Sequence, residues 1–210
     1  MSTIGTLTEF IVSRALPSHE AYLIFLPASG LPALLPKKYS LKPYRVGEVG
    51  WGTVFDLEKS YTILSQRAPQ YTRKMLEFLI NDELEAHDLR IYRVAKTADG
   101  TQFKVAVKGT GSAHELHRAV QPRKDEISKY IYGTVYFINY ANKLEEYVKN
   151  ALLPAPTKDI IKVILRQELN QIDVYVEAAS AGIFMGKRGN NVAAASKLLG
   201  LSIQITALNE

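Results

Sequence analysis

Residues 183–192 read Ile-Phe-Met-Gly-Lys-Arg-Gly-Asn-Asn-Val, and residues 193–205 continue Ala-Ala-Ala-Ser-Lys-Leu-Leu-Gly-Leu-Ser-Ile-Gln-Ile. Gly186 and Gly189 enclose Lys187 and Arg188. Glycine lets the backbone turn tightly and lets a sugar-phosphate chain approach without a side chain in the way. A helix predicted from about Asn190 would direct its unpaired N–H groups and its positive dipole end at the same loop. Together, the glycine turn, the two cationic side chains and the start of the helix predict a phosphate-binding loop.

The flanking residues decide how this tetrad is interpreted, because a lone G-x-x-G is common by chance and is most often an ordinary turn. β-branched runs at 160–165 and 172–176 predict two strands, and 201–205 predicts a closing strand. An apolar stripe from Val192 to Leu199 predicts a helix capped by Gly200. With a leading helix at 144–149, the order is helix, strand, strand, helix, G-x-x-G, helix, strand. This is the order of a type II, prokaryotic KH domain.

Four stretches carry a wider resemblance. Residues 185–205 resemble the second KH domain of the bacterial transcription factor NusA, and 141–155 resemble the helix that precedes it, with its Asn-Ala-Leu-x-Pro-Ala ending. The stretch 63–77 is similar to the opening of that family's first KH domain. Residues 30–48, with Gly-Leu-Pro-Ala-Leu-Leu-Pro and Tyr-Arg-Val-Gly-Glu, are similar to its S1 domain. The resemblance implies an S1-like OB-fold at 1–65, a first KH domain at 66–140 and a second KH domain at 141–210.

The first 65 residues also predict a small β-barrel from their own pattern. Short strand-like runs at 6–12, 22–26, 31–35, 49–55 and 61–64 are separated by proline and glycine. Exposed aromatic rings on such barrels can stack bases. Tyr22, Phe25, Tyr44 and Trp51 are candidates by composition, although filling the barrel core is the better interpretation for any one ring.

The first KH unit departs from the pattern at its loop, where Gln121-Pro122-Arg123-Lys124 replaces G-x-x-G. Pro122 fixes its own φ and has no N–H, while the side chains of Gln121 and Lys124 occupy the space that a nucleic-acid backbone would need. The grip of this unit is therefore expected to be weakened or lost. Two interpretations stay open: Arg123 and Lys124 contact phosphate as point charges, or the unit is a spacer.

The site implied by the resemblance is a groove that holds about four nucleotides of single-stranded RNA. Phosphates would lie over the loop, and bases would lie on an apolar floor. The predicted RNA-binding residues are Gly186, Lys187, Arg188, Gly189, Asn190, Ile183, Ala193, Lys197, Arg123 and Lys124. Val192 could also line this floor, but core packing is the better interpretation for it.

No catalytic residue, metal ligand or cofactor site is predicted. The chain has no cysteine and four histidines, of which only His114 and His117 share a helix face. No glutamate motif or cysteine accompanies that pair as further metal ligands, so a solvated helix surface is the better interpretation. No P-loop, nucleophile elbow or carboxylate pair stands out. We therefore expect a binding protein and not an enzyme.

Composition fits a cytoplasmic protein. Hydrophobic residues make up 47% of the chain and the formal net charge is +5, and no signal peptide or membrane-length apolar run is present. Because the sequence starts almost at the S1-like strands, the resemblance implies that NusA's N-terminal polymerase-docking domain is lacking.

Three hypotheses about the function of the chain follow. The first is a transcription factor that contacts nascent RNA, with RNA polymerase or a transcription complex as partner, and modulates elongation, pausing, termination or antitermination. The second is a freestanding protein acting on ribosomal or messenger RNA, and the third is a protein-interaction scaffold.

Overall fold

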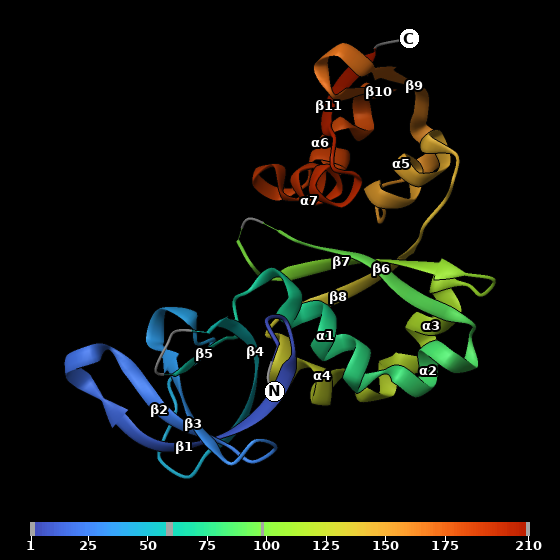
Figure 1. Ribbon diagram of the computed structural model, residues 1–210. Coiled ribbons are helices and arrows are strands. Elements are labelled where there is room, and N and C mark those ends of the chain that lie inside the picture. Colours follow the sequence, from blue (N-terminus) through green and yellow to red (C-terminus); the bar gives the residue numbers. More distant parts are fainter. Residues whose placement is uncertain (1–2, 58–60, 98, 209–210) are drawn as a thin grey trace. The chain divides into compact units, whose positions relative to one another are not determined.

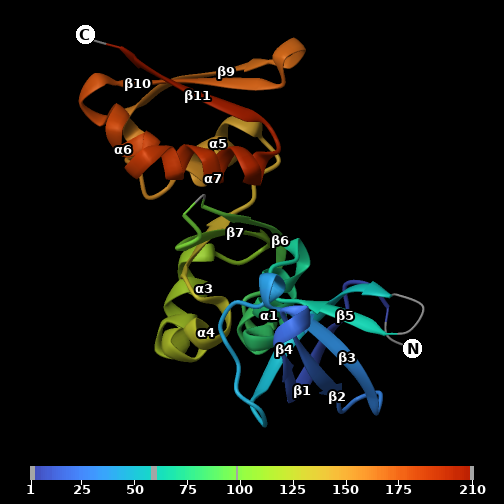
Figure 2. The ribbon, with the colours of Figure 1, turned by 90° about the vertical axis from the view of Figure 1, so that its left-hand side faces the viewer.

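The computed structural model describes residues 3–57, 61–97 and 99–208. The chain divides into two compact units (Figures 1 and 2). The first comprises residues 1–79 together with 129–132, and the second comprises 80–128 together with 133–210.

The first unit contains a closed five-stranded barrel, as the short strand-like runs of its sequence predict (Figure 1). Its strands are β1 (Leu7–Leu16), β2 (Ala21–Leu26), β3 (Leu31–Pro36), β4 (Val49–Leu57) and β5 (Thr62–Ser65). Short 3-10 turns occupy Pro17–His19 and Lys37–Tyr39. Antiparallel pairing of β1 with β4 closes the barrel, and alternate residues point inward. Phe10, Ile24, Leu35 and Leu64 are fully buried in its core.

Helix α1 (Pro69–Leu79) belongs to the same compact unit as the barrel. Trp51 of β4 stacks on Phe78 with ring centroids 4.6 Å apart. The hydroxyl of buried Tyr71 donates to the carbonyl of Tyr130 at 3.3 Å. The compact units therefore divide the chain differently from the predicted modules at 1–65, 66–140 and 141–210, which stay a prediction.

The second unit contains two three-stranded sheets with the same arrangement. The first sheet has the order β6 (Leu89–Lys96), β7 (Gln102–Gly109), β8 (Thr134–Asn139), with β8 parallel to β7. The short helix α2 (Asn81–Ala86) precedes it, and α3 (Ala113–Val120) and α4 (Lys124–Ile131) connect β7 to β8. The side chain of Ser112 caps α3 by accepting from the N–H of His114.

The second sheet has the order β11 (Ser202–Leu208), β10 (Gln171–Glu177), β9 (Ile160–Arg166), with β11 parallel to β10. Its helices α5 (Leu144–Leu152), α6 (Ala181–Met185) and α7 (Asn190–Leu199) lie on one face of the sheet (Figure 2). Gly200, with φ of 75°, caps α7. The predicted order of helices and strands around the G-x-x-G loop is thus observed.

The two sheets of the second unit share one hydrophobic core. Ala95, Ala106 and Ile138 of the first sheet belong to the same buried cluster as Val148, Leu152, Val174 and Leu198 of the second module. The two modules therefore bury apolar surface against each other as well as within themselves.

Lys104 lies within this shared core. Its ammonium group donates to the carbonyl of Ala151 and, at 2.6 Å, to the carbonyl of Leu153. Those carbonyls lie at the end of α5, where a helix leaves acceptors without internal partners. Burial lowers the pKa of Lys104 to about 7. Even the neutral amine keeps two N–H donors, enough for the two carbonyls.

Candidate nucleic-acid interface

The G-x-x-G loop connects α6 to α7 through the turn Lys187–Gly189. The N–H of Gly186 donates to the carbonyl of Gly182 at 2.9 Å, and the N–H of Gly189 donates back to Gly186 at 3.0 Å. Two successive hydrogen-bonded turns therefore form the corner between the two helices.

Left-handed backbone explains the glycines at this corner. Gly186 has φ 71° and ψ 173°, and Gly189 has φ 75° and ψ 11°. A Cβ on Gly186 would lie 2.7 Å from the Cβ of Asn191, whereas a Cβ on Gly189 would meet nothing within 4 Å. Gly186 is thus required by both conformation and packing. Gly189 is required by conformation and leaves the outer side of the loop open.

Arg188 also has left-handed backbone, with φ of 55°. This conformation is uncommon for a residue with a branched or long side chain and clusters at functional positions. The side chains of Lys187 and Arg188 are both exposed. Within the described part of the chain, neither side chain takes part in an ion pair. Two uncompensated cations thus stand at the start of α7, where the helix dipole adds positive potential.

Asn191 holds the loop in place, a role that the sequence reasoning missed. Its side-chain amide donates to the carbonyl of Phe184 at 2.9 Å and to the carbonyl of Leu152 at 3.0 Å. One side chain therefore satisfies the ends of both α6 and α5. The doubled asparagine at the start of a helix was the available sequence signal, because asparagine favours hydrogen bonds to nearby backbone.

The predicted apolar floor lies partly at the surface. Ile183 is 56% exposed and Met185 is 45% exposed, while Phe184 between them is fully buried. Ala193 is half-buried. Val192 packs against the core of the second unit. Of the predicted floor residues, Ile183 is therefore exposed, Ala193 is half-buried and Val192 packs against the core, and their contact with bases stays a prediction.

Asn190 and Lys197, two further predicted RNA contacts, form hydrogen bonds with the module that contains β6, β7 and β8, called the first module below. The side-chain amide of Asn190 donates to Asp99 at 2.7 Å, and the ammonium of Lys197 donates to the carbonyl of Lys96 at 3.2 Å. Hydrogen bonds from Thr97, Thr101 and Asn190 lower the pKa of Asp99 to about 2. Both side chains bind the β6–β7 hairpin in this structure, and their contacts with RNA stay predictions.

The corresponding loop of the first module has a different conformation. Residues Gln121–Arg123 form a 3-10 turn that leads directly into α4, with right-handed backbone at Gln121 and Lys124. Arg123 pairs with Glu83 and with Glu126, both at 2.9 Å. These two carboxylates raise the pKa of Arg123. Helical backbone replaces the glycine cradle here, and Arg123 is held by two acidic partners, while Lys124 is exposed.

The aromatic candidates of the barrel have unequal exposure. Tyr22 is 5% exposed, and Phe25 is 40% exposed. Tyr44 and Trp51 are half-buried, and the phenol of Tyr44 accepts a hydrogen bond from Gln66 at 2.7 Å. Core packing, the preferred interpretation, therefore holds for Tyr22, while Phe25 lies at the surface.

The described residues contain no group of three or more histidine, aspartate or glutamate side chains placed to hold a metal ion. Among the helices of the described ranges, none is long and apolar enough to cross a membrane.

The known proteins that this chain resembles in sequence include NusA proteins of two bacteria. The family model for the NusA-like second KH domain matches residues 144–210. The transcription termination/antitermination protein NusA of Rickettsia prowazekii is 33% identical over 66 residues, which cover 31% of this chain and 13% of that protein. The protein of the same name from Borreliella burgdorferi is 25% identical over 196 residues, covering 87% and 39%. The chain therefore spans well under half the length of these relatives.

Among solved structures, the crystal structure of APE1850 has a TM-score of 0.45 and 22% sequence identity, over 60% of this chain and 94% of that chain. The family match falls on the module that carries the Gly186–Gly189 loop. KH domains of this kind bind single-stranded RNA. The family match and the curated relatives confirm the resemblance deduced from the sequence: the chain is NusA-like, and residues 144–210 match the NusA-like second KH domain.

Proposed function

We propose that this chain binds single-stranded RNA at the surface around the Gly186–Gly189 loop, between the end of α6 and the start of α7. The observation that carries the proposal is the loop itself: two left-handed glycines, two exposed cations without acidic partners in the described structure, and the start of a ten-residue helix. Phosphates would lie over the loop, and bases would rest on an apolar floor that includes the exposed side chain of Ile183 and the half-buried Ala193.

A charge-reversal variant tests this site. Lys187→Asp with Arg188→Asp leaves both glycines in place and puts negative charge against the phosphates. Affinity for a short unstructured RNA should fall by more than about tenfold, and the slope of log K against log salt should shrink by about 1.4, since roughly 0.7 counterions are released per phosphate contact. Fluorescence anisotropy over a salt series measures both.

Lys158→Asp with Lys162→Asp is the matched control. Both lysines are exposed in the same compact unit and lie outside the loop, and the change in charge is the same. This variant should lose little affinity. Equal losses in the two variants, or full affinity in the loop variant with unchanged circular dichroism, would overturn the site assignment.

The module that contains β6, β7 and β8 is proposed to be a first KH domain, which lacks a phosphate cradle. Its order of strands and helices and its parallel β7–β8 pair repeat those of residues 144–208. Helical backbone at 121–124 and the two ion pairs of Arg123 support the interpretation as a positioning module over the one as a phosphate contact. The barrel, in turn, is proposed to be S1-like.

The cellular role proposed for the chain is contact with nascent RNA in a transcription complex, where it modulates elongation, pausing, termination or antitermination. Its support is the similarity, over 87% of the chain, to a protein named for transcription termination and antitermination. A pull-down of the tagged chain from native lysate, with and without ribonuclease, tests this role. Recovery of RNA polymerase after ribonuclease treatment is expected. Recovery of ribosomal or messenger material alone, lost on ribonuclease treatment, would replace the transcription role with that of a freestanding RNA-binding protein.

A further inference from the structure

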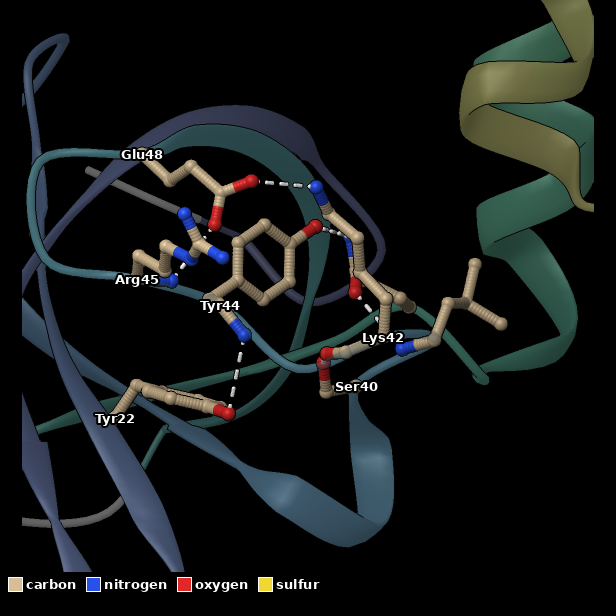
Figure 3. A network of polar contacts seen from close by, with 8 residues as sticks. Tyr22, Ser40, Lys42, Tyr44, Arg45 and Glu48 are labelled. Atoms are coloured by element: carbon tan, nitrogen blue, oxygen red, sulfur yellow. Dashed lines mark hydrogen bonds and ion pairs between the residues drawn. The ribbon is translucent and has the colours of Figure 1, made fainter.

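The Gly186–Gly189 loop has an acidic neighbour that does not neutralise its cations. In the barrel, by contrast, Lys42 forms a direct ion pair with Glu48 at 2.6 Å, as Figure 3 shows. Beside the loop, the acid is Asp99 of the β6–β7 hairpin, and its partner is the uncharged side-chain amide of Asn190, at 2.7 Å. A carboxylate is therefore bonded to the first residue of α7, while the two cations of the loop take part in no ion pair in the described ranges.

Asp99 is held mainly by its own hairpin. Its Oδ1 accepts from the hydroxyls of Thr97 and Thr101, at 2.6 and 2.9 Å, and from the N–H of Thr101 at 3.1 Å. Its Oδ2 accepts from Asn190. These hydrogen bonds lower the pKa of Asp99 to about 2, so the carboxylate is ionised at neutral pH. The negative charge therefore stays in place when Asn190 turns to another partner.

The first module also contacts the last turn of α7. The Nη1 of Arg93 donates to the carbonyl of Leu198 at 3.0 Å, and the ammonium of Lys197 donates to the carbonyl of Lys96 at 3.2 Å. At a rise of 1.5 Å per residue, these contacts lie about 10 to 12 Å along the helix from Asn190. A ligand at the loop can therefore break the bond between Asp99 and Asn190 without releasing the hairpin.

Covalent geometry limits how far this charge can be from the start of α7. The side-chain amide of Asn190 lies no more than roughly 5 Å from its own backbone N–H. The carboxylate of Asp99 is thus within roughly 8 Å of the first N–H of the helix, which is about one Debye length at physiological salt. A phosphate attracted to the helix start and to the two loop cations is consequently repelled by Asp99.

We propose that the β6–β7 hairpin restrains RNA binding at the Gly186–Gly189 loop. Asp99 engages Asn190, a predicted RNA contact, and keeps a negative charge beside the path of the phosphates. RNA and the hairpin compete for one side chain, so bound RNA weakens the contact between Asp99 and Asn190 by the same factor by which that contact weakens RNA binding. The inference rests on the proposed function, because it concerns the regulation of the same site.

Asp99→Asn tests the restraint, because it removes the charge and leaves an oxygen acceptor for the hairpin hydroxyls. The affinity of the full chain for an unstructured RNA of about 12 nucleotides should rise about two- to threefold at low salt, the effect of one unit charge roughly 7 Å away in water. The gain should shrink as salt is added. Asp125→Asn, the same change of charge at an exposed residue of α4, should leave the affinity unchanged. Equal effects of the two substitutions, or no gain with Asp99→Asn, would overturn the inference.

The Lys187→Asp, Arg188→Asp variant, measured alongside, separates this inference from the proposed function. Loss of affinity in that variant, with no gain in Asp99→Asn, would overturn the restraint and leave the proposed function standing. Full affinity in the loop variant would overturn the proposed function and, with it, the restraint.

NMR of the unsubstituted chain tests the exchange of partners without any change to the fold. On saturation with the same RNA, the side-chain amide signals of Asn190 should shift, because the amide leaves Asp99. The backbone amide signal of Thr101, which donates to the same carboxylate from within the hairpin, should shift much less. Side-chain signals of Asn190 that stay constant while the loop signals respond to RNA would contradict the competition.

Discussion

Replacing Gly186 by alanine should damage the loop far more than the same change at Gly189. At Gly186, φ of 71° with ψ of 173° lies in a region that is essentially restricted to glycine, at a cost of roughly 1–3 kcal/mol for other residues. The new Cβ would also lie 2.7 Å from the Cβ of Asn191 and 3.0 Å from its backbone nitrogen. Relieving that overlap moves the side chain that holds α5 and α6, which adds about 1 kcal/mol or more. The expected loss is about 2–4 kcal/mol.

Gly189→Ala provides the matched comparison. Its φ of 75° and ψ of 11° are ordinary left-handed values, which cost alanine roughly 1–2 kcal/mol. The added Cβ meets no atom within 4 Å. The free energy of unfolding should therefore fall by about 1–2 kcal/mol only.

Urea denaturation followed by circular dichroism measures these losses, and hydrogen exchange of β10 and β11 assigns them to the second compact unit. RNA affinity of Gly189→Ala should still fall, because the methyl group occupies the open outer side of the loop. A Gly186→Ala variant as stable as Gly189→Ala would refute the packing argument. Unchanged RNA affinity in Gly189→Ala would contradict close approach of the RNA backbone.

Three further predictions concern residues that support the site. Asn191→Ala should lower the free energy of unfolding by about 1–3 kcal/mol, because two helix-end carbonyls lose their donor; hydrogen exchange near the loop should rise, and unchanged exchange would exclude this role. Lys104→Met should cost about 2–4 kcal/mol by leaving the carbonyls of Ala151 and Leu153 buried without donors, whereas Lys108→Met on the same strand should cost less than about 1 kcal/mol; similar urea midpoints would contradict this. Because the pKa of Asp99 is lowered to about 2 from 3.8, its contribution to stability is present above pH 3.8 and is lost as the pH falls toward 2. The amide signal of Thr101, which donates to Asp99 at 3.1 Å, should titrate in that window by NMR; titration near pH 4 would refute the hydrogen-bonded carboxylate.

Much of the fold follows from local pattern. The short strand-like runs of the first 65 residues, separated by proline and glycine, predicted the strands of a barrel, and a closed barrel is observed. The run from 160 to 205 predicted three strands, the glycine loop, the helix from Asn190 and its Gly200 cap. These features could be read because periodicity and positive φ are imposed by the nearest residues along the chain. The missing glycines at 121–124 likewise predicted a loop without a cradle, and its backbone is helical.

Long-range partners could not be read in the same way. Asn190 and Lys197 look like free polar side chains of a helix, yet they bind a hairpin about 90 to 100 residues earlier in the chain. Lys104 looks like a surface lysine on an alternating strand, yet it is 3% exposed and holds the end of α5. Arg123 is a residue type that commonly contacts phosphate, but Glu83 from another helix forms an ion pair with it.

The sequence by itself determined the likeness of residues 144–210 to a KH domain, the position of the glycine loop and the glycines that give it left-handed backbone. Only the tertiary structure decided which cations face acidic partners, which residues of α7 bind the β6–β7 hairpin, and which asparagine holds the loop. The physical reason is that backbone conformation depends mainly on neighbours in sequence. Charge compensation, burial and cavities depend on residues that only the folded chain brings together.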